Sequence, residues 1–285
     1  MNRELEPIWN AILEVYDVFA KVCNDHGLRY YVAYGTALGA VRHHGFIPWD
    51  DDLDVIMPRP DYDKFRTMQK EWLPAHLKFV DWQNTKELTT CTYSKIQDAR
   101  RIKVDDLERK VQRKLPHGIY IDIFPIDGAP TGRLERWYYR TMLRLLKLSF
   151  SSFERHSSDY RRIRSIVAQL IGITARKLIF KVSKPSDLAW RYEALSRRKA
   201  FCADNECGCI ISPYGIFHGL CDYSVYGNPV YMQFQGRKVP VPEKYHKYLT
   251  ALYGDYMVLP PVEKRVSWHE DLDTAPWRFG PTLKG

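Results

Sequence analysis

The residues best suited to chemistry are the acidic ones in the run Asp50-Asp51-Asp52-Leu53-Asp54. If this run lies on a β-strand, Asp52 and Asp54 share one face, while Leu53 points into the core. Adjacent carboxylates repel one another unless a cation lies between them, and aligned carboxylate oxygens suit Mg²⁺ or Mn²⁺. The pattern therefore predicts a divalent-metal site. A solvated acidic turn, or a set of helix caps, is the alternative.

Two other positions favour the metal site over the acidic turn. Gly35-Thr36 lies at a predicted strand-to-helix junction, where backbone N–H groups and a helix N-terminus favour an anion. Asp122 is the one carboxylate in an otherwise apolar strand, and such a residue is costly unless it is paired or bound to metal. An anion cradle, two metal-holding carboxylates and a third acid together indicate metal-dependent phosphoryl transfer.

The elements that must position these residues follow from hydrophobic spacing and from Gly and Pro. Thr36 is predicted to cap a short helix over 37–43, Pro58 to end a strand, and Asp61 to cap the helix after it. From 133 to about 184 the pattern is long, basic and helical. The strands are expected at 29–34, 51–57, 93–96, 119–124 and 237–241, and further helices at 5–23, 187–203 and 243–253. Strands separated by helices predict an α/β or α+β fold in one globular unit.

The chain's net charge of +9 is concentrated in one segment. Residues 133–184 contain 13 basic and 3 acidic residues, a net charge of +10, whereas the rest contains 30 basic and 31 acidic residues. Basic helices with apolar clusters fit the surface of an anionic membrane. The alternative is a helical subdomain that packs on the core and leaves its charges solvated. Nucleic acid is not the expected partner, because no known binding module accompanies the charge.

The chain start and the cysteines point to the cytosol. The first residues mix acids with apolar residues and lack the continuous core of a signal peptide, and no apolar run approaches the length of a membrane span. Cys202, Cys207, Cys209 and Cys221 cluster, but their spacing fits zinc poorly. Buried reduced thiols are therefore expected, in a cytoplasmic protein.

The motifs resemble those of the LicD family, bacterial phosphocholine transferases related to the fukutin-type phosphosugar transferases. The similarity begins with YYVAYGTALGAVRHHGFIPWDDDLDVIMPRPDYDKF (30–65) and continues through SKIQDAR (94–100), IYIDIFPIDGAP (119–130), VPVPEKYHKYLTALYGDYMVLPP (239–261) and RVSWHE (265–270). It implies a nucleotidyltransferase-like mixed sheet flanked by helices. Residues 1–285 would form a single domain, with this core over 1–130, a basic helical insertion over 131–185 and a C-terminal part over 186–285 packed on the core.

The resemblance also implies roles for individual residues. Asp52, Asp54 and Asp122 match the acidic residues that hold Mg²⁺ or Mn²⁺ and act in catalysis. Gly35 and Thr36 would face the nucleotide phosphates, while Asp50 and Asp51 would shape the turn or the outer shell. Arg42, His43, Lys95 and His269 are carried over as substrate-binding residues. Surface salt bridges are the alternative for Arg42 and Lys95. No specific role is the alternative for His43, and a structural one for His269.

The implied function is metal-dependent transfer of phosphocholine, or a similar group, from a CDP-linked donor to a hydroxyl of a cell-surface glycan. The acceptor would be lipopolysaccharide, teichoic acid or capsule, and lipid-linked acceptors would place the enzyme on the inner face of the plasma membrane. Phosphoalditol transfer, phosphosugar transfer or nucleotidyl transfer at the same site are alternatives. A choline group would call for an aromatic cage, and the sequence does not place one. A nucleic-acid-binding protein with a decayed site is the alternative from another class.

Overall fold

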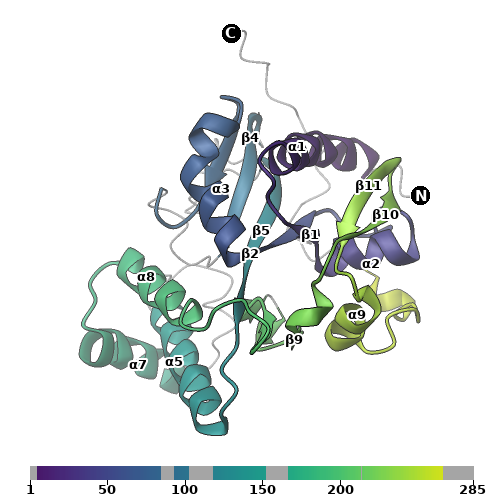
Figure 1. The fold of residues 1–285 in the computed structure, drawn as a ribbon. Helices are drawn as coiled ribbons and strands as arrows, with labels where there is room; N and C mark the ends of the chain where they lie inside the picture. The colour runs from purple at the N-terminus through teal and green to yellow at the C-terminus, as the bar shows by residue number, and fades with distance from the viewer. Residues whose placement is uncertain (1–4, 85–92, 103–117, 152–165, 213, 266–285) are drawn as a thin grey trace.

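The central sheet holds the predicted acidic strands side by side. In the computed structural model, which describes residues 5–84, 93–102, 118–151, 166–212 and 214–265, five strands follow the order β1-β2-β5-β4-β3 (Figure 1). The β2–β5 pair is parallel, and the pairs β1–β2, β5–β4 and β4–β3 are antiparallel. The fold is thus of the mixed α/β kind predicted. The strand bounds are β1 Tyr31–Val32, β2 Asp54–Pro58, β3 Leu77–Val80, β4 Ser94–Ile102 and β5 Gly118–Gly128.

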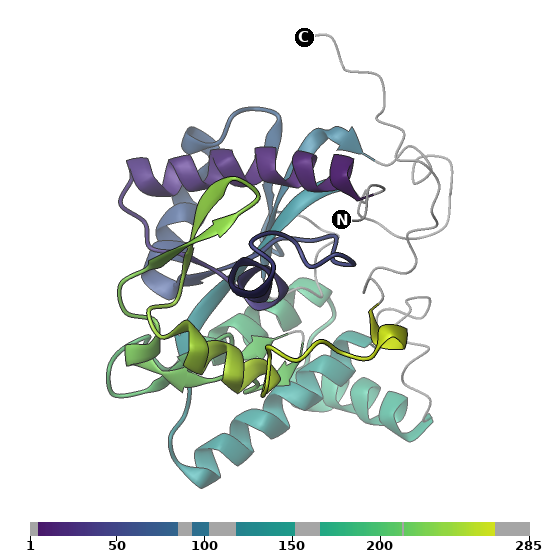
Figure 2. The same ribbon diagram turned by 90° about the vertical axis from the view of Figure 1, so that its right-hand side faces the viewer.

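Two helices cover one face of this sheet. They are α1 (Glu6–Asp25) and α3 (Arg59–Trp72). Phe19 of α1 and Phe65 of α3 are fully buried, and their ring centroids lie 5.4 Å apart. Tyr62 of α3 hydrogen-bonds Ser94 of β4, a residue that shares its sheet face with Ile96. Figure 2 shows α1 running across the strands. Apolar burial on this face therefore leaves the opposite face for the acidic residues.

The second half of the chain adds smaller elements around the sheet. α2 (Tyr34–Arg42) follows β1, and α9 (Tyr245–Tyr253) contacts it. β6 (Glu206–Gly208) pairs with the end of β5, and β9 (Cys221–Asp222) pairs with β6. The others are the hairpins β7–β8 (Ile211–Ser212 and Gly215–Ile216) and β10–β11 (Val230–Phe234 and Arg237–Val241), with the 3₁₀ turns η2 (Tyr223–Val225) and η3 (Val262–Lys264).

Residues 133–196 form what we call the helical module. It consists of α5 (Arg133–Ser151), α7 (Ile166–Thr174), the π-helical turn η1 (Ala175–Phe180) and α8 (Pro185–Ser196). Its apolar side is buried in a core of its own, separate from the main one. This second core includes Tyr139, Leu143, Leu146, Phe150, Phe180, Leu188, Tyr192, Ile210 and Phe217. The apolar side of the module is therefore buried, but in this second core and not on the main core as the alternative predicted. The exact domain boundaries stay a prediction.

Three local predictions were wrong, each for a physical reason. α2 begins at Tyr34, so Thr36 lies inside its first turn and does not cap it. α3 begins directly after Pro58, because Pro60 favours the first helical turn, and Asp61 lies within that turn. β2 begins at Asp54, so Asp52 lies in the loop before the strand.

Candidate active site

Three ionisable side chains are aligned across neighbouring strands. Asp54 of β2 lies opposite Asp122 of β5, and Asp122 lies opposite Lys95 of β4. Residues directly opposite in a sheet project from the same face, so all three point the same way. The Nζ of Lys95 is 2.6 Å from Oδ1 of Asp122. Asp122 is therefore paired with a cation, as the burial of its carboxylate requires.

Lys95 is held by aromatic rings as well as by the carboxylate. Its ammonium lies 3.6 Å from the ring centroid of Tyr120 and 5.3 Å from that of Tyr93. Cation–π attraction at a half-buried site adds to the ion pair. Two tyrosines that flank the motif strands thus orient this lysine, and the surface salt bridge considered for it is instead a largely buried one.

Thr36 fixes the start of β2. Its Oγ1 accepts a hydrogen bond of 2.9 Å from the backbone N–H of Asp54, and Thr36 is only 2% exposed. Ala33 donates its N–H to the carbonyl of Asp54 at 2.9 Å. The Gly-Thr pair therefore sets the position of the strand carboxylate through the backbone. The predicted role of Gly35 and Thr36 towards phosphates stays a prediction.

The carboxylate of Asp50 closely approaches Gly35, so a side chain at position 35 would have to displace it. A Cβ added at Gly35 would lie 2.4 Å from Oδ2 of Asp50. The indole N–H of Trp9 donates to the carbonyl of Asp50 at 2.7 Å, which anchors the loop from outside the motif. Asp50 therefore sits at the strand-to-helix turn, next to the acidic cluster.

The aspartates are close enough to perturb one another. Burial raises the pKa of Asp54 well above its usual range, and the charges of Asp52, Asp122 and Asp50 raise it further. The pKa of Asp50 is also raised well above its usual range, mainly by burial and further by the charges of Asp52 and Asp51. A bound cation would stabilise the ionised form of carboxylates that repel one another in this way. A set of oxygen ligands is what Mg²⁺ or Mn²⁺ prefers.

Asp50, Asp52 and Asp54 thus fit such an ion in their chemistry. Within the described ranges, however, no three acidic, histidine or cysteine side chains form a ready-made ligand shell. The ion pair with Lys95 engages Asp122, the third predicted ligand, so the metal site stays a prediction.

Of the substrate-binding candidates, Arg42 is turned towards the C-terminal segment, and His43 lies beside it. Nη1 of Arg42 donates to the carbonyl of Tyr256 at 2.6 Å, and burial lowers the pKa of Arg42. Nε of Arg42 lies 3.4 Å from Nδ1 of His43, and burial, then Arg42 and His44, lower the pKa of His43. The neutral imidazole is therefore favoured. The substrate-binding roles of Arg42 and His43 stay predictions. His269 lies outside the described residues.

Sequence reasoning did not identify two tyrosines beside the cluster, Tyr214 and Tyr253. Burial raises the pKa of Tyr214 to about 12, and the charges of Asp54, Asp50 and Asp52 contribute to that rise. The hydroxyls of Tyr214 and Tyr253 are 3.1 Å apart. Both residues come from elements far along the chain. Tyr253 lies within the motif at 239–261, but that motif assigns it no role.

The cysteine cluster consists of thiols on neighbouring strands. Cys207 of β6 and Cys221 of β9 are opposite one another, and both are buried and reduced. Burial raises the pKa of Cys207 to about 12 and that of Cys221 to about 11. Such thiols are weak nucleophiles at neutral pH.

The comparisons with known proteins agree with this geometry. Residues 27–128, which contain all five strands of the central sheet from β1 to β5, match the family model "LicD/FKTN/FKRP, nucleotidyltransferase domain". Over 261 residues the chain is 29% identical to the lipopolysaccharide cholinephosphotransferase LicD of Haemophilus influenzae, covering 90% of this chain and 92% of that one. Residues 27–128 are therefore a nucleotidyltransferase domain of the LicD/FKTN/FKRP kind.

The chain also matches two uncharacterized proteins of Rickettsia over short stretches. It is 46% identical over 41 residues to one from Rickettsia typhi and 57% identical over 36 residues to one from Rickettsia prowazekii. The matches cover 14% and 13% of this chain respectively. They show local similarity alone. The match to the LicD of Haemophilus influenzae extends well beyond the nucleotidyltransferase domain.

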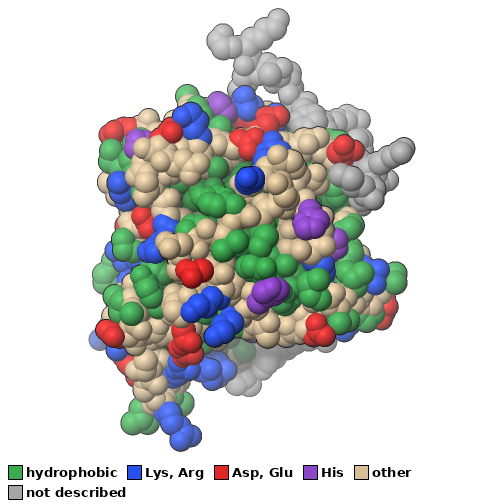
Figure 3. All heavy atoms as spheres, turned by 45° about the vertical axis from the view of Figure 1, so that its right-hand side comes forward, with side chains coloured by type: hydrophobic (Ala, Val, Ile, Leu, Met, Phe, Trp, Pro, Cys, Tyr) green, Lys and Arg blue, Asp and Glu red, His purple; other side chains and the backbone are tan. Residues whose placement is uncertain are grey.

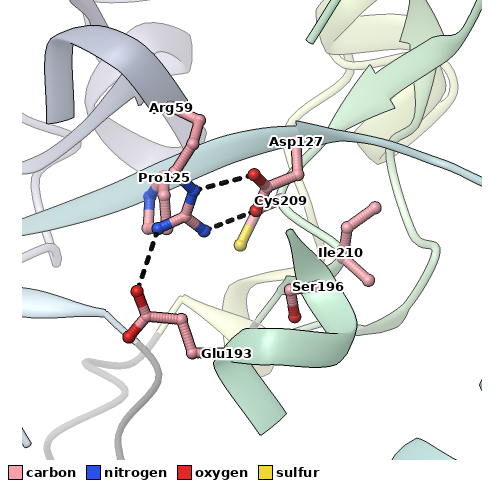
Figure 4. A pocket seen from close by; sticks show the side chains of 7 residues that line it. All are labelled: Arg59, Pro125, Asp127, Glu193, Ser196, Cys209 and Ile210. Atoms are coloured by element: carbon pink, nitrogen blue, oxygen red, sulfur yellow. Dashed lines mark hydrogen bonds and ion pairs between the residues drawn. The ribbon is translucent and has the colours of Figure 1, made fainter. Parts of the chain in front are cut away.

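A buried ionic network ties the acidic strands of this LicD-type chain to the helical module. The guanidinium of Arg59 binds Asp127 of β5 through Nε and Nη2, at 2.7 and 2.5 Å, and lies 3.6 Å from Glu193 of α8 (Figure 4). Nη1 of Arg66 donates to the same Glu193 at 2.7 Å. Burial alone would raise the pKa of Glu193, but the hydrogen bond from Arg66 and the charges of Arg66 and Arg59 lower it.

The cavity beside this network is too small for a substrate. Its volume is about 10 Å³, which is the space of a single water. It opens near Asp127, five residues along β5 from Asp122, or roughly 17 Å at the rise of a strand. The cavity therefore belongs to the structural network and not to the carboxylates. The lining residues are Arg59, Pro125, Asp127, Glu193, Ser196, Cys209 and Ile210.

Proposed function

We propose that this protein transfers phosphocholine from a CDP-linked donor to a hydroxyl group of a cell-surface glycan. The observation that carries the proposal is the alignment of Asp54, Asp122 and Lys95 on one sheet face, beside Asp50 and Asp52. A relative that spans nearly the whole chain is named as a lipopolysaccharide cholinephosphotransferase, which supports the choice of the transferred group and of a glycan acceptor.

The reaction joins the acceptor oxygen to the distal phosphorus of the donor. That bond forms as the bond from this phosphorus to the bridging oxygen breaks, and CMP leaves with the electron pair. Asp52 and Asp54 would hold the divalent cation, which when bound supplies positive charge to the diphosphate. Asp122 is then the strand carboxylate left to accept the proton of the hydroxyl. Protonation of Asp122 would neutralise the carboxylate that pairs with Lys95. The charge of Lys95 would then stabilise the negative charge that develops on the departing phosphate.

A donor panel tests this proposal. The full-length protein is incubated with a glycan acceptor and with CDP-choline, CDP-ribitol, CDP-glycerol or CTP, each with Mg²⁺ and with EDTA. We expect CMP release from CDP-choline with Mg²⁺ and its loss with EDTA. Turnover of CDP-ribitol or CDP-glycerol in preference to CDP-choline would instead assign a phosphoalditol transferase, a candidate favoured by the family model's inclusion of FKTN and FKRP. Pyrophosphate release from CTP would assign a nucleotidyltransferase.

The surface of the helical module supports a location for the reaction at an anionic membrane. Large apolar side chains are exposed at the start of α5, where Leu134 is 85% and Trp137 is 67% exposed, and in η1, where Leu178 is 69% exposed. The first turns of α5 lie at the lower end of the molecule in Figures 1 and 2, and Figure 3 shows Lys and Arg side chains among hydrophobic ones there. Apolar side chains flanked by cations suit the interface of an anionic bilayer.

In the part of the chain that the structure describes, no helix is both long and apolar enough to cross a membrane. Peripheral binding through the helical module is therefore the form of association that we propose.

A further inference from the structure

Two tyrosines form an open corner beside the acidic cluster. The rings of Tyr214, in the β7–β8 hairpin, and Tyr253, at the end of α9, are perpendicular, with centroids 5.7 Å apart. Their hydroxyls lie 3.1 Å apart and hold the two elements together. Tyr214 is 39% exposed and Tyr253 is half-buried, so both rings reach solvent. We call this pair the aromatic corner.

The aromatic corner is continuous with the candidate active site. The ring of Tyr214 lies 5.6 Å from that of Tyr34, the residue before Gly35. Tyr34 in turn contacts Phe124, two residues from Asp122 on the same face of β5, at 5.3 Å. The charges of Asp54, Asp50 and Asp52 all contribute to the raised pKa of Tyr214. A group bound in the corner would therefore adjoin the carboxylates.

This combination favours a bulky, weakly hydrated cation. Two ring faces at right angles present negative quadrupoles to one volume, and the neighbouring carboxylates add negative potential. A quaternary ammonium gains from both and needs no hydrogen-bond acceptor of its own, unlike a primary ammonium. In a phosphocholine group the ammonium is only two carbons from the phosphate oxygen. A phosphate at Asp52 and Asp54 would therefore keep its ammonium close to these carboxylates, whose charges act on Tyr214.

We propose that Tyr214 and Tyr253 bind the trimethylammonium group of the donor. This inference rests on the proposed function, because it assigns a subsite to the same donor. The alternative is that the donor's nucleobase stacks on the same rings. In that case, replacing either tyrosine should weaken the binding of every CDP-linked compound equally.

Equilibrium binding separates these possibilities. Affinities for CDP-choline and CDP-ethanolamine are measured by titration calorimetry, without acceptor, for the wild type, Tyr214→Ala, Tyr214→Phe and Tyr253→Leu. We expect the wild type to prefer CDP-choline. Tyr214→Ala and Tyr253→Leu should weaken the binding of CDP-choline by about 5- to 20-fold and change the affinity for CDP-ethanolamine by less than about 2-fold. Tyr214→Phe should keep the preference for CDP-choline, because it keeps the aromatic ring.

The control is Tyr231→Ala, which removes a 58% exposed tyrosine from β10, and thermal unfolding confirms that each variant is folded. Absence of a preference in the wild type, a preference that survives Tyr214→Ala, or equal weakening of both ligands would overturn the inference. A choline preference that depends on Tyr214, in a protein that releases no CMP from CDP-choline, would support the corner and reject the proposed reaction instead.

Discussion

Asp54 and Asp122 lie directly opposite each other on the parallel strands β2 and β5. Parallel neighbours bring residues from distant parts of the chain to one face without a turn between them. Lys95 continues the row on β4, at 2.6 Å from Asp122. The sheet register therefore places two acids and one cation in a line, and the predicted reaction depends on that line.

Replacing Lys95 tests the cation of this row. We expect Lys95→Met to lower the rate of CMP release by at least about 100-fold, because it removes the charge next to the diphosphate and leaves Asp122 without its partner. Lys95→Arg should keep part of the activity, since it keeps the charge. Lys21→Met, which breaks an exposed pair with Asp25 on α1, is the matched control and should be neutral. Equal activity of Lys95→Met and Lys21→Met would contradict the assignment.

Thr36 gives a test of backbone positioning. In Thr36→Val the N–H of Asp54 loses its acceptor in a buried setting, at a cost of about 1–3 kcal/mol in the free energy of unfolding. CMP release should fall as well, because the start of β2 is no longer fixed. Thr36→Ser keeps the hydroxyl and should restore most of both quantities, measured by urea unfolding and by the donor assay. Similar losses in the serine and valine variants would show that the hydroxyl is not what matters.

The ionic network predicts a pH-dependent stability. The pKa of Glu193 is lowered in the folded state, so its contribution is fully present above about pH 4.5 and is lost as the pH falls through the lowered value. Glu193→Gln should therefore reduce the free energy of unfolding by about 1.5–3 kcal/mol at pH 7, because Arg66 and Arg59 lose one of their carboxylate partners and keep Asp81 and Asp127. The difference from the wild type should shrink towards pH 3. A difference that is constant from pH 7 to 3 would mean that folding does not lower the pKa of Glu193.

The helical module predicts binding to vesicles. At low salt the wild type should sediment with vesicles that contain anionic lipid and not with purely zwitterionic ones. The double variant Leu134→Ser/Trp137→Ser should weaken this binding by about 10-fold or more, because it removes two exposed apolar side chains. The control Tyr231→Ser removes an exposed aromatic residue from β10. Equal binding by the wild type and the double variant would assign the apolar surface to another role.

Much of the fold could be predicted because local signals were strong. The strand at 237–241 was predicted with the observed bounds, and Pro58 ends β2 as expected. Leu53 and Val55 are fully buried, as the alternation around the aspartates required. The errors at Thr36 and Asp61 arose because Ser, Thr and Asp favour both the cap and the first turn, and only the tertiary structure decides between them.

The candidate site was predictable only in part. The motif fixed which acids matter, but the pairing of Asp122 with Lys95 depends on the register between β5 and β4. The aromatic corner depends on two elements that meet through folding, so its tyrosines could not be distinguished from the other seventeen in the sequence. Positions set by tertiary contacts leave no periodic trace along the chain.

The most direct test of the account is the rate of CMP release from CDP-choline by Asp52→Asn. We predict a loss of at least about 1,000-fold with Mg²⁺, together with an unchanged circular dichroism spectrum and cooperative unfolding. The control Asp25→Asn, which alters a half-exposed carboxylate on α1, should be fully active. Undiminished CMP release by folded Asp52→Asn, at controlled metal concentration, would contradict the central claim that the acidic cluster before β2 carries the reaction.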